Sequence, residues 1–296
     1  MGQSQSQLAR TESLIERGGG DLAESLECCR RITARAGSSF GVGIRLTPAR
    51  CRDAMHAIYA WMRLADDAAD ADAPAGDRGV VLDRMGSLTA RAFAGQASGS
   101  IWPAFASTVA AHGLEQGWFE SFLAGMRTDL GPVALETHQD LEQYCDRVAG
   151  NVGRCCVAIW GFRSGADADR GYHLAGLRGR AFQLINIARD LEEDARAGRR
   201  YVPAERLRHL NAGATDPAVR ADLLREAIDL LEGSSSLDAM VRRDAGPALW
   251  AMTRAYRLVA RRSGQAGANA SLGGGAKLGI AAGAIGRRVL AAGRLA

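Results

Sequence analysis

Two groups of oxygen-bearing side chains at helical spacing have the chemistry to bind divalent cations. Asp66 and Asp70 stand four residues apart, with Asp67 beside them, in the segment YAWMRLADDAADAD. Residues four apart lie on one face of a helix, so these carboxylates repel each other unless a cation compensates their charge. Arg63, three residues before Asp66, falls on the same face. This segment therefore predicts a negatively charged helix face with a cation at its edge.

The second group lies in the segment QLINIARDLEEDARAGRRYVP. Asn186, Asp190 and Asp194 recur every fourth position and form one polar stripe on a helix, and Gln183 lies one turn earlier. Apolar residues form a second stripe at about a right angle to the first: Leu184, Ile187 and Leu191. Three arginines flank the polar stripe: Arg189, Arg199 and Arg200. An oxygen-rich stripe beside an apolar one is typical of a helix that lines a cavity.

The ligand that suits both groups is a magnesium diphosphate. Mg²⁺ prefers hard oxygen ligands and commonly binds one or two carboxylates together with substrate phosphates. Metal ions on two facing acidic helices would neutralise a departing diphosphate and promote cleavage of its C–O bond. Each motif alone is more typical of a solvated helix face, so the prediction depends on the occurrence of both.

The elements that position these residues are expected to be helices. Runs with alternating β-branched residues are missing, so no sheet is expected. Helices are predicted at 21–36, 48–71, 78–95, 101–112, 116–128, 138–162, 167–195, 203–211, 216–233, 235–243 and 245–262. We expect a flexible N-terminal tail (1–20), one all-α domain (21–262) and a Gly/Ala-rich basic C-terminal tail (263–296).

The composition argues against several classes of function and location for this protein. The 37 basic and 33 acidic residues leave a net charge of +4, which gives no general case for nucleic-acid binding. Six cysteines without a C-x-x-C pair, and histidines without zinc-ligand spacing, favour reduced thiols over a metal or disulfide framework. The polar N-terminal segment is no secretory signal, and no run of 18 apolar residues occurs. We expect a cytoplasmic protein.

The C-terminal tail has two interpretations. From residue 245 onward the chain has eight basic residues and no acidic one. The simpler interpretation is a frayed end after the last helix. The alternative is a peripheral contact with the anionic inner face of a membrane.

Three segments together strongly resemble the squalene/phytoene synthase family: Ser38–Asp70, Tyr144–Cys156 and Gly179–Pro203. They follow the family's order and spacing within about residues 21–262. The resemblance implies an all-α isoprenoid (terpenoid) synthase fold, a single helical bundle around a deep apolar cavity with two Asp-bearing helices facing each other at its mouth. It also implies Mg²⁺-dependent head-to-head condensation of two prenyl diphosphates.

The resemblance also implies residue roles. The metal-binding positions are Asp66, Asp67, Asp70, Asn186, Asp190 and Asp194. Arg63 matches a diphosphate-binding arginine, and Ser39 and Phe40 fall in a lid motif over the diphosphate. Tyr144 matches a tyrosine beside the carbocation. The remaining matched substrate-binding positions are Val148, Gly153, Gln183, Arg199 and Tyr201, and Arg189 joins them as a cation beside the second stripe.

Some positions depart from the family pattern. Asp146 stands where many members have a second tyrosine. Gly41 and Val42 replace lid positions that are often Ser/Tyr or Tyr/Tyr.

Several products and functions stay open. The motif NIARDLEED favours members that start from two prenyl diphosphates, and we expect farnesyl diphosphate to be converted to presqualene diphosphate or squalene. Phytoene synthesis from geranylgeranyl diphosphate is the runner-up, and use of NADPH is open. A non-catalytic assembly factor of the same family is the alternative from another class, although such members have lost metal carboxylates that are present here. A terpene cyclase or a chain-elongating synthase fits the motifs less well.

Overall fold

The computed structural model describes residues 5–16, 20–35, 40–266, 280 and 284, and these form two compact units. The first unit comprises 1–41 and 49–131, and the second comprises 42–48 and 132–296. Both units include part of the range 21–262 that the sequence predicts as one domain, and that domain assignment stays a prediction. The Asp66–Asp70 motif belongs to the first unit and the Asn186–Asp194 motif to the second.

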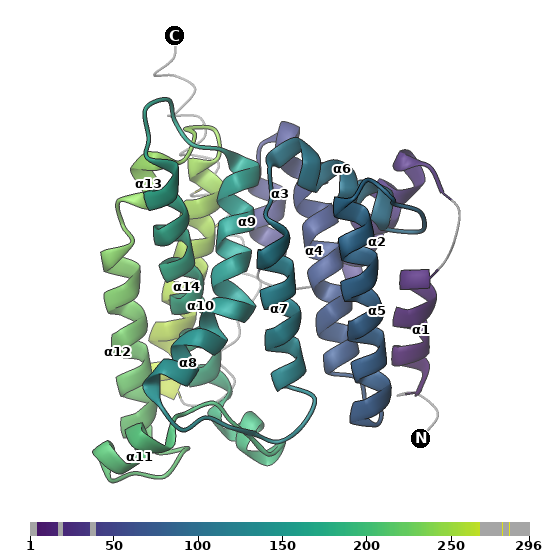
Figure 1. The fold of residues 1–296 in the computed structure, drawn as a ribbon. Coiled ribbons are helices and arrows are strands. Elements are labelled where there is room, and N and C mark those ends of the chain that lie inside the picture. The colour runs from purple at the N-terminus through teal and green to yellow at the C-terminus, as the bar shows by residue number, and fades with distance from the viewer. Residues whose placement is uncertain (1–4, 17–19, 36–39, 267–279, 281–283, 285–296) are drawn as a thin grey trace. The chain divides into compact units, whose positions relative to one another are not determined.

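The first unit is built around one central helix (Figure 1). Its helices are α1 (Gln5–Glu16), α2 (Leu22–Arg35), α4 (Ala49–Ala69), α5 (Ala75–Phe93), α6 (Trp102–His112) and α7 (Gln116–Thr128). Helix α4 contacts each of the other five. Trp61 on α4 is fully buried, meets the ring of Phe119 edge-on with centroids 5.0 Å apart, and donates a hydrogen bond of 2.9 Å to Thr89 Oγ1. This aromatic core fixes the end of α4, where Asp66 lies.

The second unit is built around α10 (Ala168–Arg196), the longest of the described helices (Figure 1). The elements around it are α8 (His138–Cys145), the π-helix η1 (Asp146–Gly150), α9 (Asn151–Trp160), α11 (Ala204–Leu210), α12 (Pro217–Gly233), α13 (Leu237–Met240) and α14 (Gly246–Ala266). A short parallel pair joins β1 (Val133–Ala134) to β2 (Arg199–Arg200). Helix α3 (Phe40–Leu46) contributes its residues 42–46 to this unit.

Two buried arginines connect α10 to neighbouring elements by hydrogen bonds. Arg178 on α10 donates to the main-chain oxygen of Ser234 at 2.6 Å and to the carboxylate of Asp238. Arg220 on α12 donates to the main-chain oxygen of Ala188 at 2.9 Å and to the carboxylate of Glu192. Buried guanidinium groups are stable only with such partners, so these bonds hold α10 in one orientation.

The predicted helices are confirmed, except that the predicted helix 138–162 is interrupted by η1 and that only 237–240 of the range 235–243 forms a helix. Three further differences concern elements that the sequence pattern does not predict. Residues 5–16, expected to lie in a flexible tail, form helix α1, because Leu8, Thr11 and Ile15 make a stripe that is buried in the first unit. Helix α3 was not expected, since its seven residues include two glycines, which are poor helix formers. The strands β1 and β2 were not expected either, because two residues are too few for an alternating pattern.

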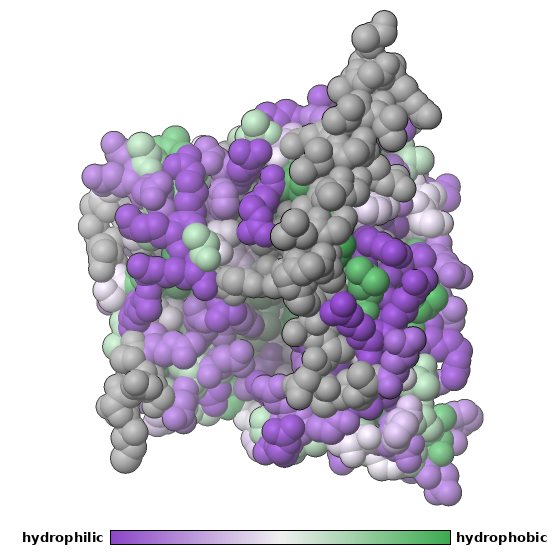
Figure 2. Space-filling model, turned by 180° about the vertical axis from the view of Figure 1, so that it is seen from behind, coloured by the Kyte–Doolittle hydropathy of each residue, from purple (hydrophilic) through white to green (hydrophobic). Residues whose placement is uncertain are grey.

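The described surface is largely polar. In the view of Figure 2, hydrophilic residues cover most of the uncovered face, and hydrophobic residues occur in small groups. None of the described helices combines the length and the apolarity that crossing a bilayer requires. All six cysteines lie among the described residues, where they are buried and form no disulfide bond. The C-terminal tail, apart from residues 263–266, Ile280 and Ala284, lies outside the described residues.

Candidate active site

The first acidic motif ends helix α4. Asp66 and Asp67 occupy its last turn, and Asp70 follows directly, its main-chain N–H donating to the oxygen of Asp66 at 2.9 Å. Arg63 lies 3.1 Å from the carboxylate of Asp66 and 2.5 Å from that of Asp67. The apolar side of this helix end is buried through Leu64. The spacing thus places three carboxylates and one arginine together, as expected.

The electrostatics of this motif favour binding of a cation. Burial, and then the charge of Asp70, raise the pKa of Asp66 from 3.8 to about 6, although Arg63 opposes the rise. The shift means that the folded chain disfavours the negative charge of Asp66, first because of burial and then because of the neighbouring carboxylates. A divalent cation would supply the missing positive charge.

The second motif forms a half-buried polar stripe on α10. Asn186 donates to Gln183 Oε1 at 3.4 Å. Arg189 donates two hydrogen bonds, of 2.7 and 2.5 Å, to the Asp190 carboxylate. Arg199, from β2, has its Nε 3.5 Å from Asp194 Oδ1. Both aspartates of the stripe therefore face a guanidinium group.

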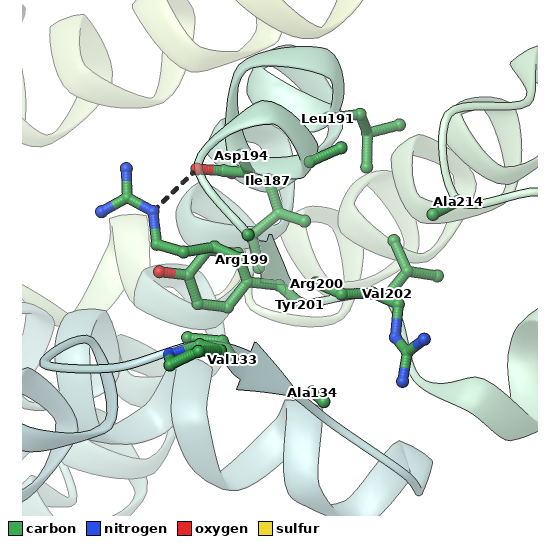
Figure 3. A pocket seen from close by; sticks show the side chains of 13 residues that line it. Val133, Ala134, Ile187, Leu191, Asp194, Arg199, Arg200, Tyr201, Val202 and Ala214 are labelled. Atoms are coloured by element: carbon green, nitrogen blue, oxygen red, sulfur yellow. Dashed lines mark ion pairs between the residues drawn. The ribbon is translucent and has the colours of Figure 1, made fainter.

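The neighbouring apolar stripe borders a cavity, as the sequence predicts. Leu184, Ile187 and Leu191 are buried, and the last two line a cavity of about 370 Å³ together with Asp194. Figure 3 shows Asp194 and its ion pair to Arg199 at one side of this space. The other lining residues are Pro132, Val133, Ala134, Ala195, Gly198, Arg199, Arg200, Tyr201, Val202 and Ala214. An apolar space with a few charged groups is typical of small-molecule sites.

Tyr144 and Tyr201 form a stacked pair. Their ring centroids are 4.7 Å apart at an interplanar angle of 26°, and both side chains are buried. Tyr144 lies on α8, and Tyr201 directly follows β2. The β1–β2 pair fixes the chain at this point, since Leu135 N–H donates to the oxygen of Arg200. The sequence offered no signal for this stacking, because it depends on a strand pair that was not expected.

Two further predicted positions lie in the segment after Tyr144. Val148 is buried in η1. Gly153 on α9 faces the main-chain oxygen of Ala175 on α10, at a distance that leaves no room for a side chain. The π-helix was not foreseen, since one extra residue per turn leaves the helical periodicity of the sequence almost unchanged. Ser39 lies outside the described residues, and Phe40 is described only as the first residue of α3.

The donor set fits magnesium. Both motifs supply only oxygen ligands, five carboxylates and one amide, which is the ligand class that Mg²⁺ prefers. Among the described residues, no three His, Cys, Asp or Glu side chains converge as a preformed metal site. The arginines paired with Asp66, Asp190 and Asp194 occupy positions where a metal-bound diphosphate would compete for the same groups.

Comparisons with known proteins agree on one family. A sequence profile of the squalene/phytoene synthase family matches residues 33–280. The chain is 36% identical over 186 residues to the presqualene diphosphate synthase of Rhodopseudomonas palustris, a match that covers 62% of this chain and 65% of that protein, just under two thirds of its length. It is 34% identical to the 15-cis-phytoene synthase of Synechococcus elongatus, covering 80% and 82% of the two chains.

Solved structures give the same result for the fold. The crystal structure of a squalene synthase from Alicyclobacillus acidocaldarius superposes with a TM-score of 0.74 at 28% identity, over 82% of this chain and 95% of that one. A dehydrosqualene synthase superposes with a TM-score of 0.78 at 22% identity, covering 90% and 96% of the two chains. The fold is therefore the isoprenoid synthase fold. With most of its length matched, the chain belongs to the squalene/phytoene synthase family.

Proposed function

We propose that this protein joins two molecules of farnesyl diphosphate head to head and releases diphosphate, with presqualene diphosphate as the first product. The observation that carries the proposal is the half-buried Asn186–Asp190–Asp194 stripe on α10, whose last residue lines an apolar cavity and whose two aspartates pair with arginines. A diphosphate head and a hydrocarbon chain need these two surfaces side by side. The similarity to presqualene diphosphate synthases supports the C15 substrate.

The acidic residues have the role of metal ligands in this proposal. Asp66, Asp67 and Asp70, and Asn186, Asp190 and Asp194, would hold Mg²⁺, which when bound supplies the positive charge that stabilises the departing diphosphate. Arg63, Arg189 and Arg199 lie beside these carboxylates and are the groups available to bind diphosphate oxygens.

The apolar and aromatic residues have the role of protecting and guiding the carbocation. The C1–O bond of the donor breaks, and its electron pair leaves with the diphosphate. The C2=C3 double bond of the acceptor supplies the electrons of the new carbon–carbon bond, and loss of a proton closes the cyclopropane ring. Ile187 and Leu191 exclude water, which would quench the cation. The buried ring of Tyr144 stabilises positive charge, and its hydroxyl can relay the proton.

The test is product analysis. Purified protein is incubated with Mg²⁺ and either farnesyl or geranylgeranyl diphosphate, with and without NADPH, and the lipid is identified. We expect a C30 cyclopropyl diphosphate from the farnesyl donor, and squalene if NADPH is used. Phytoene from the geranylgeranyl donor would establish the runner-up function, which the similarity to phytoene synthases supports. No product from either donor would favour the non-catalytic alternative.

A matched pair of variants tests the metal assignment. Asp190→Ala should abolish turnover while leaving the circular dichroism spectrum unchanged. Glu193→Ala, an exposed carboxylate three residues further along α10, should keep wild-type turnover. Equal turnover in the two variants would remove Asp190 from the site.

A further inference from the structure

Asp146, which departs from the family pattern, opens the π-helix η1 of the second unit. The main-chain N–H of Asn151 donates to the oxygen of Asp146, five residues back, instead of four as in an α-helix. Single π-turns of this kind are rare and frequently occur at functional sites. Tyr144 lies only two residues before the turn, and Val148 lies inside it.

An ion pair between Asp146 and Arg154, called the clamp below, spans this π-turn. The Asp146 carboxylate receives two parallel hydrogen bonds from Arg154 on α9, of 2.9 and 3.1 Å. Arg154 also donates to Asn151 Oδ1 at 2.9 Å, and Asn151 donates to the main-chain oxygen of Arg147 at 3.2 Å. Only 20% of the Arg154 side chain is exposed. Bidentate pairs of this type fix geometry as well as adding energy, so the clamp joins the residue that opens the turn to the helix that follows it.

Two glycines make room for the clamp. A Cβ atom on Gly150 would lie within 3.0 Å of the Asp146 carboxylate, and one on Gly176 of α10 would lie within 3.0 Å of the Arg154 guanidinium. Real Cβ atoms essentially never come so close to another heavy atom. Each end of the ion pair thus packs against the backbone of one glycine, from η1 at Asp146 and from α10 at Arg154, while 37% of the Asp146 side chain stays exposed.

We propose that Asp146 is a positioning residue for Tyr144. The clamp holds the π-turn and thereby sets the place of the Tyr144 ring against Tyr201. The proposal rests on the proposed function in one respect, namely that the Tyr144 ring acts on the carbocation. A ring that acts mainly in the transition state affects turnover more than substrate binding.

The kinetic test is a double-mutant cycle. Asp146→Asn should lower kcat by about tenfold or more, as for misplacement of a reacting group by a fraction of an ångström, with little change in KM. Tyr144→Phe should also lower kcat, and the double variant should be no slower than the slower of the two single variants, because Asp146 acts through Tyr144. Asp169→Asn, an exposed carboxylate in the first turn of α10, is the matched control and should leave kcat unchanged.

Two results would overturn the inference while leaving the proposed function intact. One is full additivity of the Asp146 and Tyr144 effects on kcat. The other is an Asp146→Asn variant with wild-type kcat. A purely structural role would instead lower thermal stability and the active fraction but leave kcat per active molecule unchanged.

A readout without turnover keeps the two proposals separable. Tyr144→Phe identifies the near-ultraviolet circular dichroism of the Tyr144–Tyr201 stack as a difference spectrum. Asp146→Asn should lose a large part of this signal, and the charge-swapped variant Asp146→Arg/Arg154→Asp should recover part of it. An unchanged signal in Asp146→Asn would contradict the positioning role even if the protein formed no product.

Discussion

Replacing Asp66 by Asn should stabilise the metal-free protein. The carboxyl group of Asp66 has a pKa of about 6 instead of 3.8, because of burial and then the charge of Asp70. The folded chain therefore disfavours the ionised form, and Asn removes this charge. Asn also keeps an oxygen that accepts the 3.1 Å hydrogen bond from Arg63.

The magnitude follows from the pKa shift and the exposure of the side chain. A rise from 3.8 to about 6 corresponds to about 3 kcal/mol, at roughly 1.4 kcal/mol per pKa unit. Because 43% of the Asp66 side chain is exposed, solvent screening reduces this to about 1 kcal/mol.

The direction of the pKa shift sets how the stability difference between Asp66→Asn and wild type changes with pH. Below about pH 4, Asp66 is protonated in the folded and the unfolded chain, so wild type and variant have equal stability. As the pH rises from about 4 through about 6, the unfolded chain is ionised at this position while the folded chain still holds the proton, so the wild type loses stability until the folded chain ionises as well. The advantage of Asp66→Asn should therefore grow between about pH 4 and pH 7 and then level off.

The assay is urea unfolding in EDTA, followed by tryptophan fluorescence across this pH range. Asp72→Asn, an exposed carboxylate beyond the helix end, is the control and should show no such trend. Added Mg²⁺ should reverse the order, because it stabilises only the protein that binds it well. If Asp66→Asn is less stable than wild type at about pH 7.5 without metal, the account of charge repulsion is wrong.

Three further predictions concern other parts of the chain. Gly179→Ala should cost about 1–3 kcal/mol in urea unfolding, because the new Cβ would meet the backbone of η1, whereas Gly117→Ala, with open space around it, should be neutral or stabilising. Arg178→Met should lower the free energy of unfolding by about 3 kcal/mol, because the buried main-chain oxygen of Ser234 loses its charged donor. A variant as stable as wild type would show that this hydrogen bond is dispensable. Deleting 267–296 should weaken sedimentation with anionic liposomes more than activity in solution, and unchanged sedimentation would exclude a membrane role for the tail.

The local sequence pattern is sufficient to predict the placement of side chains where a single helix supplies all the residues concerned. The stripe of Asn186, Asp190 and Asp194, and the apolar stripe of Ile187 and Leu191 beside it, follow directly from helical periodicity, and the structure places both as expected. The grouping of Arg63 with Asp66 has the same origin.

Features that depend on distant residues could not be predicted. Arg178 and Arg220 look like surface residues in the sequence, and only the packing of α10 against its neighbours shows that they are buried. The Tyr144–Tyr201 stack likewise requires two segments that meet only in the folded chain. Helix α1 was missed because its few apolar residues are diluted by polar ones.

The parallel pair of β1 and β2 has a consequence for the order of folding. Val133 pairs with Arg199, so this contact closes a long loop that contains α8, η1, α9 and α10. Closing so long a loop costs chain entropy before any contact repays it, and such contacts form late. Tyr201 directly follows β2, so we expect its stacking on Tyr144 to form together with that closure. During refolding, we therefore expect the helical circular dichroism signal to appear well before catalytic activity, and the segment around β1, β2 and Tyr201 to fold last.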